Sequence, residues 1–383
     1  MRIAFVTLYG LGAHGGTTKV LCDLANGLRL RGHDVGVFYF ERREPKIPYP
    51  LNADILRFNC CQTARDKVFG AEFLSKLRGV FAWGRKNRRI ARNDFEAKYK
   101  GNAISRGLKN FNPDVVISFS QLTTYMLLAK MKVNVPVVTM LHSNPQSYFD
   151  RPEFSVFKQY LEQSAAIQVL MPEFVDVVNG YLNAQKVSYI PNIVPQYDEI
   201  AELISPRIIN VARVMSVKRQ HLLIEAFALI SEKYPDWNVE IWGQINKRYE
   251  TQLQTLILKY NLQERVFLKG PSGQIEDKLN KSSIFVFPSQ KEGFAIALCE
   301  AMSMGLPVVG CKSCSAVNSL IIDGKNGFLC EDSAESISIA IDKLIVDCKL
   351  RKRLGLQARA DMAKFSNESV ITQWEKLLSQ VRK

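Results

Sequence analysis

Residues 283–302 read Ser-Ile-Phe-Val-Phe-Pro-Ser-Gln-Lys-Glu-Gly-Phe-Ala-Ile-Ala-Leu-Cys-Glu-Ala-Met. The run at 283–287 is rich in β-branched and aromatic residues and predicts a buried strand. Apolar side chains then recur at helical spacing up to Met302, and Gly305 with Pro307 ends the segment. The stretch therefore predicts a strand, a turn and a helix, as in an α/β protein.

The turn of this stretch carries a glycine and is framed by two carboxylates, Glu292 and Glu300. Gly293 lets the backbone come close to a bound group. The backbone N–H groups at the start of the helix form a natural anion site; they belong to Phe294, Ala295, Ile296 and Ala297. Because an ionised carboxylate only accepts hydrogen bonds, an acidic pair beside an anion site fits a ligand with hydroxyls next to its phosphates. A nucleotide sugar is such a ligand.

With its flanking residues, the acidic pair resembles the Glu-x7-Glu motif of retaining glycosyltransferases of the GT-B fold. Pro-Ser stands at 288–289, and Glu-Ala-Met-x-x-Gly-x-Pro-Val-Val stands at 300–309; these surroundings resemble family 4. The alternative is an ordinary amphipathic helix with two solvated glutamates, which leaves the glycine and the apolar turn unexplained. The resemblance implies an α/β protein of GT-B fold, with two Rossmann-like domains whose parallel sheets face across a cleft.

Composition agrees with a globular protein of two or three domains: the chain has 383 residues, of which 47% are hydrophobic. No apolar run approaches the roughly 18 residues that span a bilayer. The eight cysteines are scattered, and Cys311-x-x-Cys314 has no second pair of matching spacing, so neither a disulfide framework nor a metal site is indicated. A reducing cytoplasm is the simplest location.

The first half alternates strands and helices. Strands at 3–8 and 35–39 flank a helix that Thr17 or Thr18 can cap, which predicts a parallel βαβ unit. The Gly15-Gly16-x-x-Lys-Val loop before that helix resembles the family's Gly-Gly-x-x-Arg-Val loop, which contacts the donor's phosphates and sugar. The alternative is a tight βα turn without a ligand.

A strand at 135–140 leads to His142. The carboxyl end of a parallel strand is where open α/β sheets bind ligands. His142 resembles the family's histidine near the donor sugar, although a lone histidine is more often structural.

The net charge of +14 is concentrated between Lys76 and Lys109, where eleven basic residues face only Asp94 and Glu96. Aromatic and aliphatic residues are interleaved there, which suits an anionic membrane surface. The predicted membrane or acceptor patch consists of Lys76, Arg78, Arg85, Lys86, Arg88, Arg89 and Arg92. A solvated helix face is the ordinary alternative. Nucleic acid is not expected as a partner, because no nucleic-acid motif accompanies the charge.

In the second half, Arg213 and Lys218 follow a strand at 207–212. They resemble the family's Arg and Lys that neutralise the donor diphosphate, with Arg219 where the family has glycine. Fixed cations stabilise the charge that a diphosphate leaving group gains. The turn at Gly270 and Pro271 corresponds to the family's seat for the nucleotide base.

The resemblance implies an acceptor-binding domain at 1–195, a donor-binding domain at 205–364, and a C-terminal helix at about 365–383 that packs back on the first domain. It implies transfer of a hexose or N-acetylhexosamine from a UDP-sugar, with retention, to a growing lipid-linked glycan, cell-surface polysaccharide or lipopolysaccharide. Glu292 and His142 would act at the sugar, and Glu300 would accept the ribose hydroxyls. No cofactor or metal is expected, because the chain has no Asp-x-Asp. The enzyme would work in the cytoplasm, peripherally on the membrane.

Two other functions remain open from the sequence. An isomerase of the nucleotide-sugar 2-epimerase kind shares the GT-B fold and needs no acceptor. A non-catalytic protein would bind a nucleotide sugar and turn nothing over.

Overall fold

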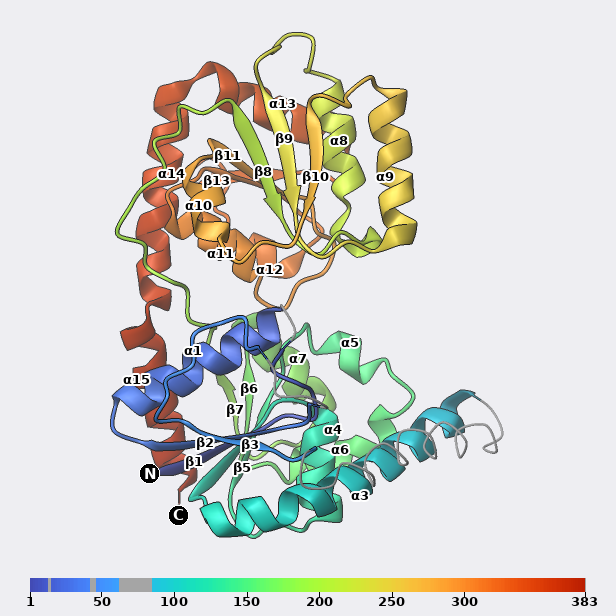
Figure 1. The fold of residues 1–383 in the computed structure, drawn as a ribbon, viewed down its shortest axis with the longest axis vertical. Coiled ribbons are helices and arrows are strands. Elements are labelled where there is room, and N and C mark those ends of the chain that lie inside the picture. Colours follow the sequence, from blue (N-terminus) through green and yellow to red (C-terminus); the bar gives the residue numbers. More distant parts are fainter. Residues whose placement is uncertain (13–14, 42–45, 62–84, 383) are drawn as a thin grey trace. The chain divides into compact units, whose positions relative to one another are not determined.

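The chain forms two compact units, residues 1–193 together with 367–383, and residues 194–366 (Figure 1). The computed structural model describes residues 1–12, 15–41, 46–61 and 85–382, and only the backbone of residues 85–88. No helix among these described residues is long and apolar enough to cross a membrane.

Unit 1, residues 1–193 with 367–383, is built on a seven-stranded sheet in the order β3-β2-β1-β4-β5-β6-β7, with every strand pair parallel. The strands are β1 (Arg2–Val6), β2 (Asp34–Tyr39), β3 (Leu56–Asn59), β4 (Val115–Ser118), β5 (Val137–Met140), β6 (Ala166–Val169) and β7 (Val187–Tyr189). The first strand is entirely apolar after Arg2 and fully buried, as expected for a central parallel strand.

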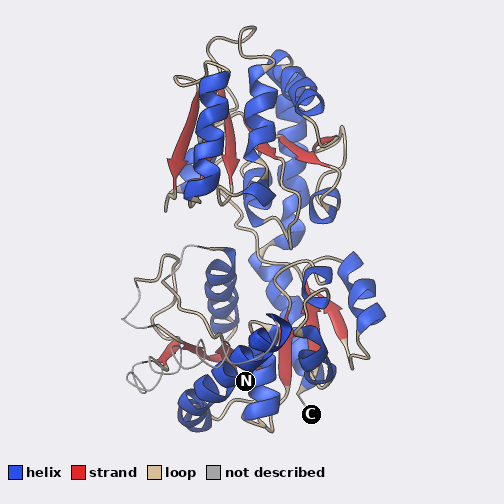
Figure 2. Ribbon diagram, turned by 90° about the vertical axis from the view of Figure 1, so that its right-hand side faces the viewer, coloured by secondary structure: helices blue, strands red, loops and turns tan. Residues whose placement is uncertain are grey.

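The helices of unit 1 flank this sheet (Figure 2). They are α1 (Gly16–Leu30), α3 (Arg85–Phe111), α4 (Gln121–Tyr125), a π-helix (Met126–Lys130), α5 (Gln146–Phe149), α6 (Phe154–Glu162), α7 (Glu173–Tyr181) and α15 (Asn367–Val381). The C-terminal helix α15 lies against α1, where a Cβ added to Gly27 would come within 2.4 Å of Ile371 Cδ1. A residue without a side chain thus permits the close approach of the two helices.

Unit 2, residues 194–366, has a six-stranded parallel sheet in the order β10-β9-β8-β11-β12-β13. The strands are β8 (Arg207–Val211), β9 (Asn238–Trp242), β10 (Val266–Gly270), β11 (Ile284–Phe287), β12 (Val308–Cys311) and β13 (Gly327–Cys330). The helices are a 3₁₀ turn (Ser216–Lys218), α8 (Gln220–Ala228), α9 (Lys247–Lys259), α10 (Ile275–Asn280), α11 (Ile296–Ser303), α12 (Ser315–Asn318), α13 (Ala334–Val346), α14 (Cys348–Met362) and a 3₁₀ turn (Ala363–Phe365).

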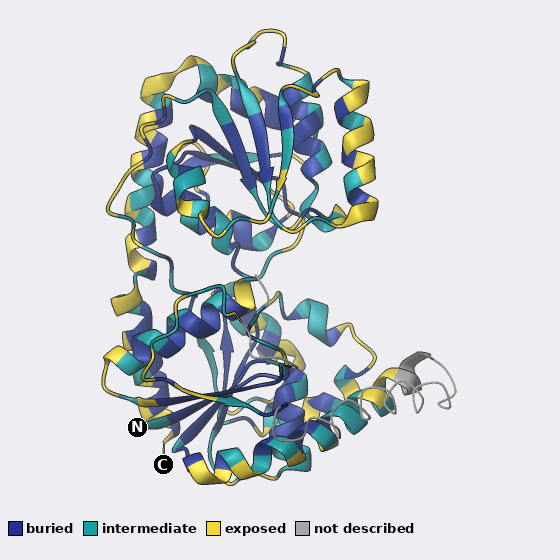
Figure 3. Cartoon of the chain, in the orientation of Figure 1, coloured by how far each residue is buried: buried dark blue, intermediate teal, exposed yellow. Residues whose placement is uncertain are grey.

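Both sheets reverse their strand order once, between β1 and β4 in unit 1 and between β8 and β11 in unit 2. The inner strands β4, β5, β6, β11 and β12 are buried, while the outward faces of helices such as α9 are exposed (Figure 3). Ligands of such doubly wound sheets bind outside the carboxyl ends of the strands, at the point where the order reverses. The expectation of two Rossmann-like α/β domains is therefore confirmed.

One local prediction is wrong. Neither Thr17 nor Thr18 caps α1, because the helix begins one residue earlier, at Gly16, and its N-cap is Gly15 with no side-chain hydrogen bond. Both threonines lie inside the first turn, where their hydroxyls are past the position from which a cap bonds.

Candidate functional site

Most of the predicted site residues of unit 2 follow the carboxyl ends of three of its strands. Arg213 and Lys218 come after β8, Gly270 ends β10, and Glu292 follows β11. Carboxyl ends of parallel strands lie at one edge of a sheet, and β8 and β11 are direct neighbours at the reversal of strand order. The fold thus brings together residues that are up to 79 positions apart.

Lys218 and Glu292 form an ion pair between Lys218 Nζ and Glu292 Oε1. Both side chains are largely withdrawn from water, with 13% and 11% of their surfaces exposed. The ammonium also lies 5.9 Å from the centre of the Phe287 ring. A pair so shielded is weakly screened, and removing one partner leaves the other charge uncompensated.

The backbone after Glu292 turns sharply before α11. Ala295, the N-cap of the helix, has φ 55° and ψ 53°, so a residue with a side chain, and not Gly293, takes the left-handed conformation. Phe294 is buried and packs edge-on against Phe365. The ring anchors the turn inside unit 2, which leaves the backbone of this segment as the part that a ligand can reach.

The N–H groups of this turn have no acceptor in the described part of the chain. This holds for the backbone N–H groups of Phe294, Ala295, Ile296 and Ala297. Unpaired N–H groups at the start of a helix, together with the helix dipole, favour an anion. Glu300 lies half-buried in the second turn of α11.

Arg213 is exposed, and no acid among the described residues pairs with it. Its position is fixed through the backbone, because Gln220 Nε2 donates to Arg213 O at 3.1 Å. The guanidinium can therefore receive an anion without breaking an existing ion pair.

Arg219, which the sequence marked only as a departure from the family's glycine, ties three loops together. Its Nε donates to Pro288 O at 2.7 Å, one terminal nitrogen to Asp332 Oδ2 at 2.7 Å and the other to Ser313 Oγ at 3.1 Å. The guanidinium lowers the pKa of Asp332. Arg219 itself has φ 50° and ψ 38°, the conformation that glycine adopts at no cost.

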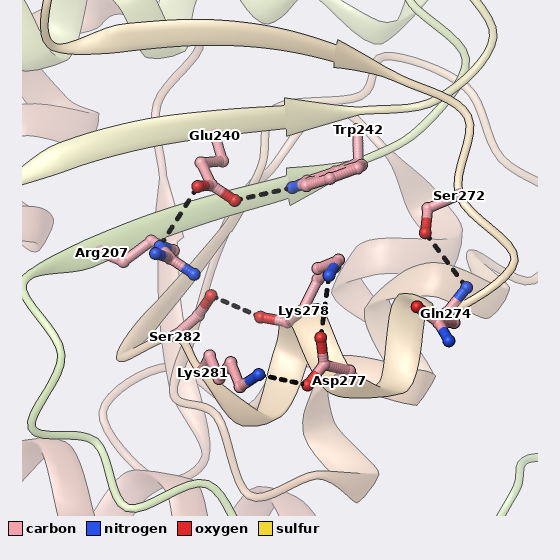
Figure 4. A network of polar contacts seen from close by, with 9 residues as sticks. All are labelled: Arg207, Glu240, Trp242, Ser272, Gln274, Asp277, Lys278, Lys281 and Ser282. Carbon is pink, nitrogen blue, oxygen red and sulfur yellow. Dashed lines mark hydrogen bonds and ion pairs between the residues drawn. The ribbon is translucent and has the colours of Figure 1, made fainter.

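A second polar cluster lies beside the predicted seat of the base (Figure 4). Glu240 accepts a hydrogen bond of 2.9 Å from Trp242 Nε1, and Arg207 Nε lies 3.4 Å from the same carboxylate, at an angle too poor for a hydrogen bond. Lys278 of α10 lies 5.6 Å from the centre of the Trp242 ring. Its neighbour Asp277 joins Lys278 at 2.8 Å and Lys281 at 2.7 Å.

The ends of the strands beside this cluster approach closely. Gly243 N donates to Gly270 O at 2.8 Å. Gly243 has φ 143°, and a Cβ there would lie 2.0 Å from Ala212 O. Gly270 has φ 75° and leads into the exposed Pro271. Only glycine fits at position 243. The close approach that it permits fixes the backbone beside Gly270, where the predicted site for the nucleotide base lies.

In unit 1, His142 follows β5 and stacks on Phe119 with ring centres 4.9 Å apart. Its Nε2 is buried and has no hydrogen-bond partner among the described residues. Burial lowers the pKa of His142 to about 4, so the ring is neutral near pH 7. A buried ring nitrogen without a partner is a position at which a ligand can complete a hydrogen bond.

Gly15 and Gly16 form the N-cap and first residue of α1. A Cβ at Gly15 would meet no atom of the described residues within 4 Å. The packing of unit 1 therefore does not by itself require a glycine at this position.

The basic patch is only partly visible. Lys76 and Arg78 lie outside the described residues, and the side chains of Arg85, Lys86 and Arg88 are likewise outside them. Arg89 and Arg92 are exposed on α3, and Arg89 Nε lies 3.8 Å from Glu153. No group of three metal-binding side chains occurs among the residues that the structure describes.

Comparison with known families matches each half of the chain separately. Residues 14–196 match the family described as Glycosyltransferase Family 4, and residues 201–361 match the family described as Glycosyl transferases group 1. The two matches adjoin and leave only short ends unassigned.

Among curated relatives, an uncharacterized glycosyltransferase of Haemophilus influenzae is 22% identical over 98% of this chain and 99% of its own length. A poly(ribitol-phosphate) alpha-N-acetylglucosaminyltransferase of Staphylococcus aureus is 26% identical over 63% of this chain and half of its own length. A poly(glycerol-phosphate) alpha-glucosyltransferase of Bacillus subtilis is 29% identical over 45% of this chain and 25% of its own length.

Solved structures give the same fold. A mutant of S. aureus TarM in complex with fondaparinux, alpha-GlcNAc-glycerol and UDP superposes with a TM-score of 0.81, at 16% identity, over 99% of this chain and 100% of that one. Anabaena HepE in complex with UDP and glucose gives 0.75, at 17% identity, over 99% of both chains. The GT-B fold expected from the sequence is thereby confirmed.

Proposed function

Since the chain belongs to the GT-B glycosyltransferases of the family 4 type, we propose that it transfers a hexose or N-acetylhexosamine from a UDP-sugar to a growing glycan, with retention of anomeric configuration. The observation that carries the proposal is the cluster at the carboxyl edge of the unit 2 sheet. At this edge lie the exposed Arg213, the shielded Lys218–Glu292 pair and the unpaired N–H groups at the start of α11. Relatives and solved structures named for glycosyl transfer and UDP support this choice of substrate class.

The donor diphosphate is assigned to Arg213, Lys218 and the N–H groups at the start of α11. As the glycosidic bond breaks, the diphosphate gains negative charge, which fixed positive charge stabilises more in the transition state than in the substrate. Lys218 has three N–H donors. It can therefore bond a phosphate oxygen without releasing Glu292.

Glu292 is assigned to the sugar and Glu300 to the ribose. The second oxygen of Glu292 can accept a sugar hydroxyl, and its charge favours the positive charge that develops at the anomeric carbon. The acceptor hydroxyl attacks from the side of the leaving group, and the leaving phosphate takes its proton. Gly270 and Pro271 are assigned to the uracil.

In unit 1, His142 and the Gly15–Gly16 turn are assigned to the donor sugar and its phosphates. The unpartnered Nε2 of His142 supports this assignment, because a neutral ring can accept from or donate to a hydroxyl, depending on its tautomer.

The acceptor is proposed to be lipid-linked or a cell-surface polysaccharide or lipopolysaccharide, with the enzyme on the cytoplasmic face of the membrane. Exposed Arg89 and Arg92 support an anionic surface as partner. Each such cation near an anionic bilayer contributes about 1 kcal/mol, so a patch of several holds a protein there reversibly.

The test is a transfer assay with radiolabelled UDP-sugars and a membrane extract, comparing the wild type, Glu292→Gln and Glu331→Gln. Glu331 supplies a matched control, because it forms an exposed ion pair with Lys312 at 2.7 Å. Label that enters lipid or polymer, and is lost only in Glu292→Gln, supports the proposal. Label that changes only as free nucleotide sugar indicates an epimerase, and tight UDP binding without turnover indicates a silent binder.

A further inference from the structure

A hollow of about 640 Å³ lies on unit 2, outside the donor site. Its lining consists of Lys325, Lys349, Lys352, Arg353, Leu356 and Gln357. Lys325 belongs to the turn that precedes β13, and therefore lies at the amino edge of the sheet. The proposed donor residues follow the carboxyl ends of the strands, at the opposite edge. The hollow is thus a separate feature of the same unit.

Three of its cations form one face of α14. Lys349, Lys352 and Arg353 are spaced i, i+3 and i+4, and Leu356 and Gln357 continue the same face by another turn. Like charges at this spacing repel one another. They also stand in the first two turns of a helix with no acidic residue in its first turn, where the helix dipole disfavours cations. Unliganded, this face is electrostatically unfavourable.

No acid in the described part of the chain forms an ion pair with these four cations, all of which are exposed. Two acids of the adjoining segments each accept a backbone hydrogen bond. Asp347 caps α14 by accepting from Leu350 N at 2.8 Å, and Asp323 accepts from Leu329 N at 2.9 Å. Other surface lysines of unit 2 do have acidic partners, as Lys233 has in Asp342 at 2.6 Å.

The hollow has a fixed wall. Asn326 is fully buried beside Lys325, and its Nδ2 donates to Asp361 Oδ2 of α14 at 2.7 Å. The other oxygen of Asp361 accepts from Gln357 Nε2 at 2.8 Å. Asn326 also accepts from Ile322 N at 2.7 Å, which closes the turn. These bonds hold the Lys325 turn against α14, so the backbone of the cationic site is preformed.

We propose that this hollow binds a phosphodiester-bearing chain. Ammonium and guanidinium groups only donate hydrogen bonds, so the ligand must supply acceptors, and the four unpaired positive charges favour an anion with at least two phosphates. The volume is far larger than one phosphate needs and lies in the range of small-molecule sites. Leu356 is 57% exposed and, with the lysine stems, offers apolar contact to the polyol carbons between phosphates. This combination of positive charge with apolar contact favours a chain of alternating phosphates and polyols over a membrane surface.

The test measures binding and so does not depend on the proposed transfer reaction. A fluorescent oligo(glycerol phosphate) is titrated into the whole protein, in the wild type and in Lys349→Gln/Lys352→Gln/Arg353→Gln. Loss of three charge contacts is expected to raise Kd by roughly tenfold or more at low salt and to flatten the salt dependence. Thermal unfolding checks that both proteins are folded, and Leu356→Ala is expected to weaken binding without changing the salt dependence.

The matched control, Lys233→Gln/Lys259→Gln/Lys312→Gln, removes the same charge from other faces of unit 2. An equal loss of affinity in the control would show general attraction to a basic protein and overturn the proposal. Binding of phosphatidylglycerol vesicles that depends on the three α14 cations, while the oligomer binds both variants alike, would assign the hollow to a membrane and overturn it as well. Loss of transfer in Glu292→Gln with unchanged oligomer binding would separate the two sites.

Discussion

Replacing Arg219 by glycine sets two effects of opposite sign against each other. The glycine relieves the left-handed backbone at φ 50°, which costs an ordinary residue roughly 1–2 kcal/mol. It also removes three hydrogen bonds from a side chain that is 12% exposed. Loss of the bond to Pro288 O leaves the carbonyl of this buried residue unpaired and costs about 1.5–3 kcal/mol. The pair with Asp332, which is 36% exposed, adds only about 1 kcal/mol.

The lost bonds outweigh the relieved strain, so Arg219→Gly is expected to destabilise the protein by about 0.5–3 kcal/mol. The larger effect is expected on catalysis. Arg219 adjoins Lys218 and holds the loop that follows β11, on which Glu292 lies. A looser Lys218–Glu292 pair is expected to lower kcat/KM for the UDP-sugar about tenfold or more, since small displacements in a site are costly.

The assay combines urea unfolding with initial-rate kinetics of the whole chain. Asn261→Gly is the control, because exposed Asn261 has φ 56° and no comparable set of contacts, so this change affects only a left-handed backbone position and is expected to be nearly neutral. Arg219→Lys keeps the positive charge but cannot make all three hydrogen bonds, so its stability and kcat/KM should lie between those of the wild type and Arg219→Gly. If Arg219→Gly behaves like Asn261→Gly in both stability and kcat/KM, the three contacts of the Arg219 side chain have no role and the reasoning fails.

Three further predictions concern the backbone, pH and metal. Gly243→Ala should abolish folding of unit 2 or lower the free energy of unfolding by at least about 3 kcal/mol, because the new Cβ would lie 2.0 Å from Ala212 O. Far-UV circular dichroism and urea unfolding measure this effect. Gly273→Ala is the control and should be neutral, because a Cβ there meets no described atom within 4 Å. Burial lowers the pKa of His142 to about 4, whereas the unfolded chain keeps the usual histidine pKa of about 6.5. Between these pH values the unfolded chain therefore binds more protons than the folded one. As the pH is lowered from 6.5 to 4, the midpoint of urea unfolding should decrease more in the wild type than in His142→Asn. EDTA should leave the initial transfer rate unchanged, and an activity restored only by added divalent metal would contradict the assignment of the diphosphate to protein cations.

The fold could be predicted from sequence where local pattern and tertiary role agree. Residues 283–302 form β11 and α11 as expected, because a short apolar run and a helical repeat are each set by near neighbours. Edge strands are harder to predict: β13, at the end of the unit 2 sheet, is four residues long and pairs with β12. Its strand character comes from a neighbour that no local pattern reveals.

The sequence predicts which residues belong to the site, but it does not predict the contacts between them. Lys218 and Glu292 were each expected at the ligand, yet their ion pair joins residues 74 positions apart and depends on the reversal of strand order. Arg219 was visible as a departure from glycine, but the carbonyl, hydroxyl and carboxylate that it bonds come from three separate loops. The left-handed backbone conformation of Ala295 could not be predicted from the sequence, because alanine has no preference for that conformation.

The return of α15 to α1 makes unit 2 an insertion within unit 1, which has a consequence for synthesis on the ribosome. Unit 1 lacks its last helix until residues 367–381 have been translated. Until then the contact between Gly27 of α1 and Ile371 of α15 cannot form. All of unit 2, up to Ser366, is translated before α15 begins. Unit 1 therefore cannot complete its fold before all of unit 2 has been synthesised. A chain that stops at Ser366 would carry all of unit 2 but a unit 1 without α15, which leaves open the face of α1 that packs against α15.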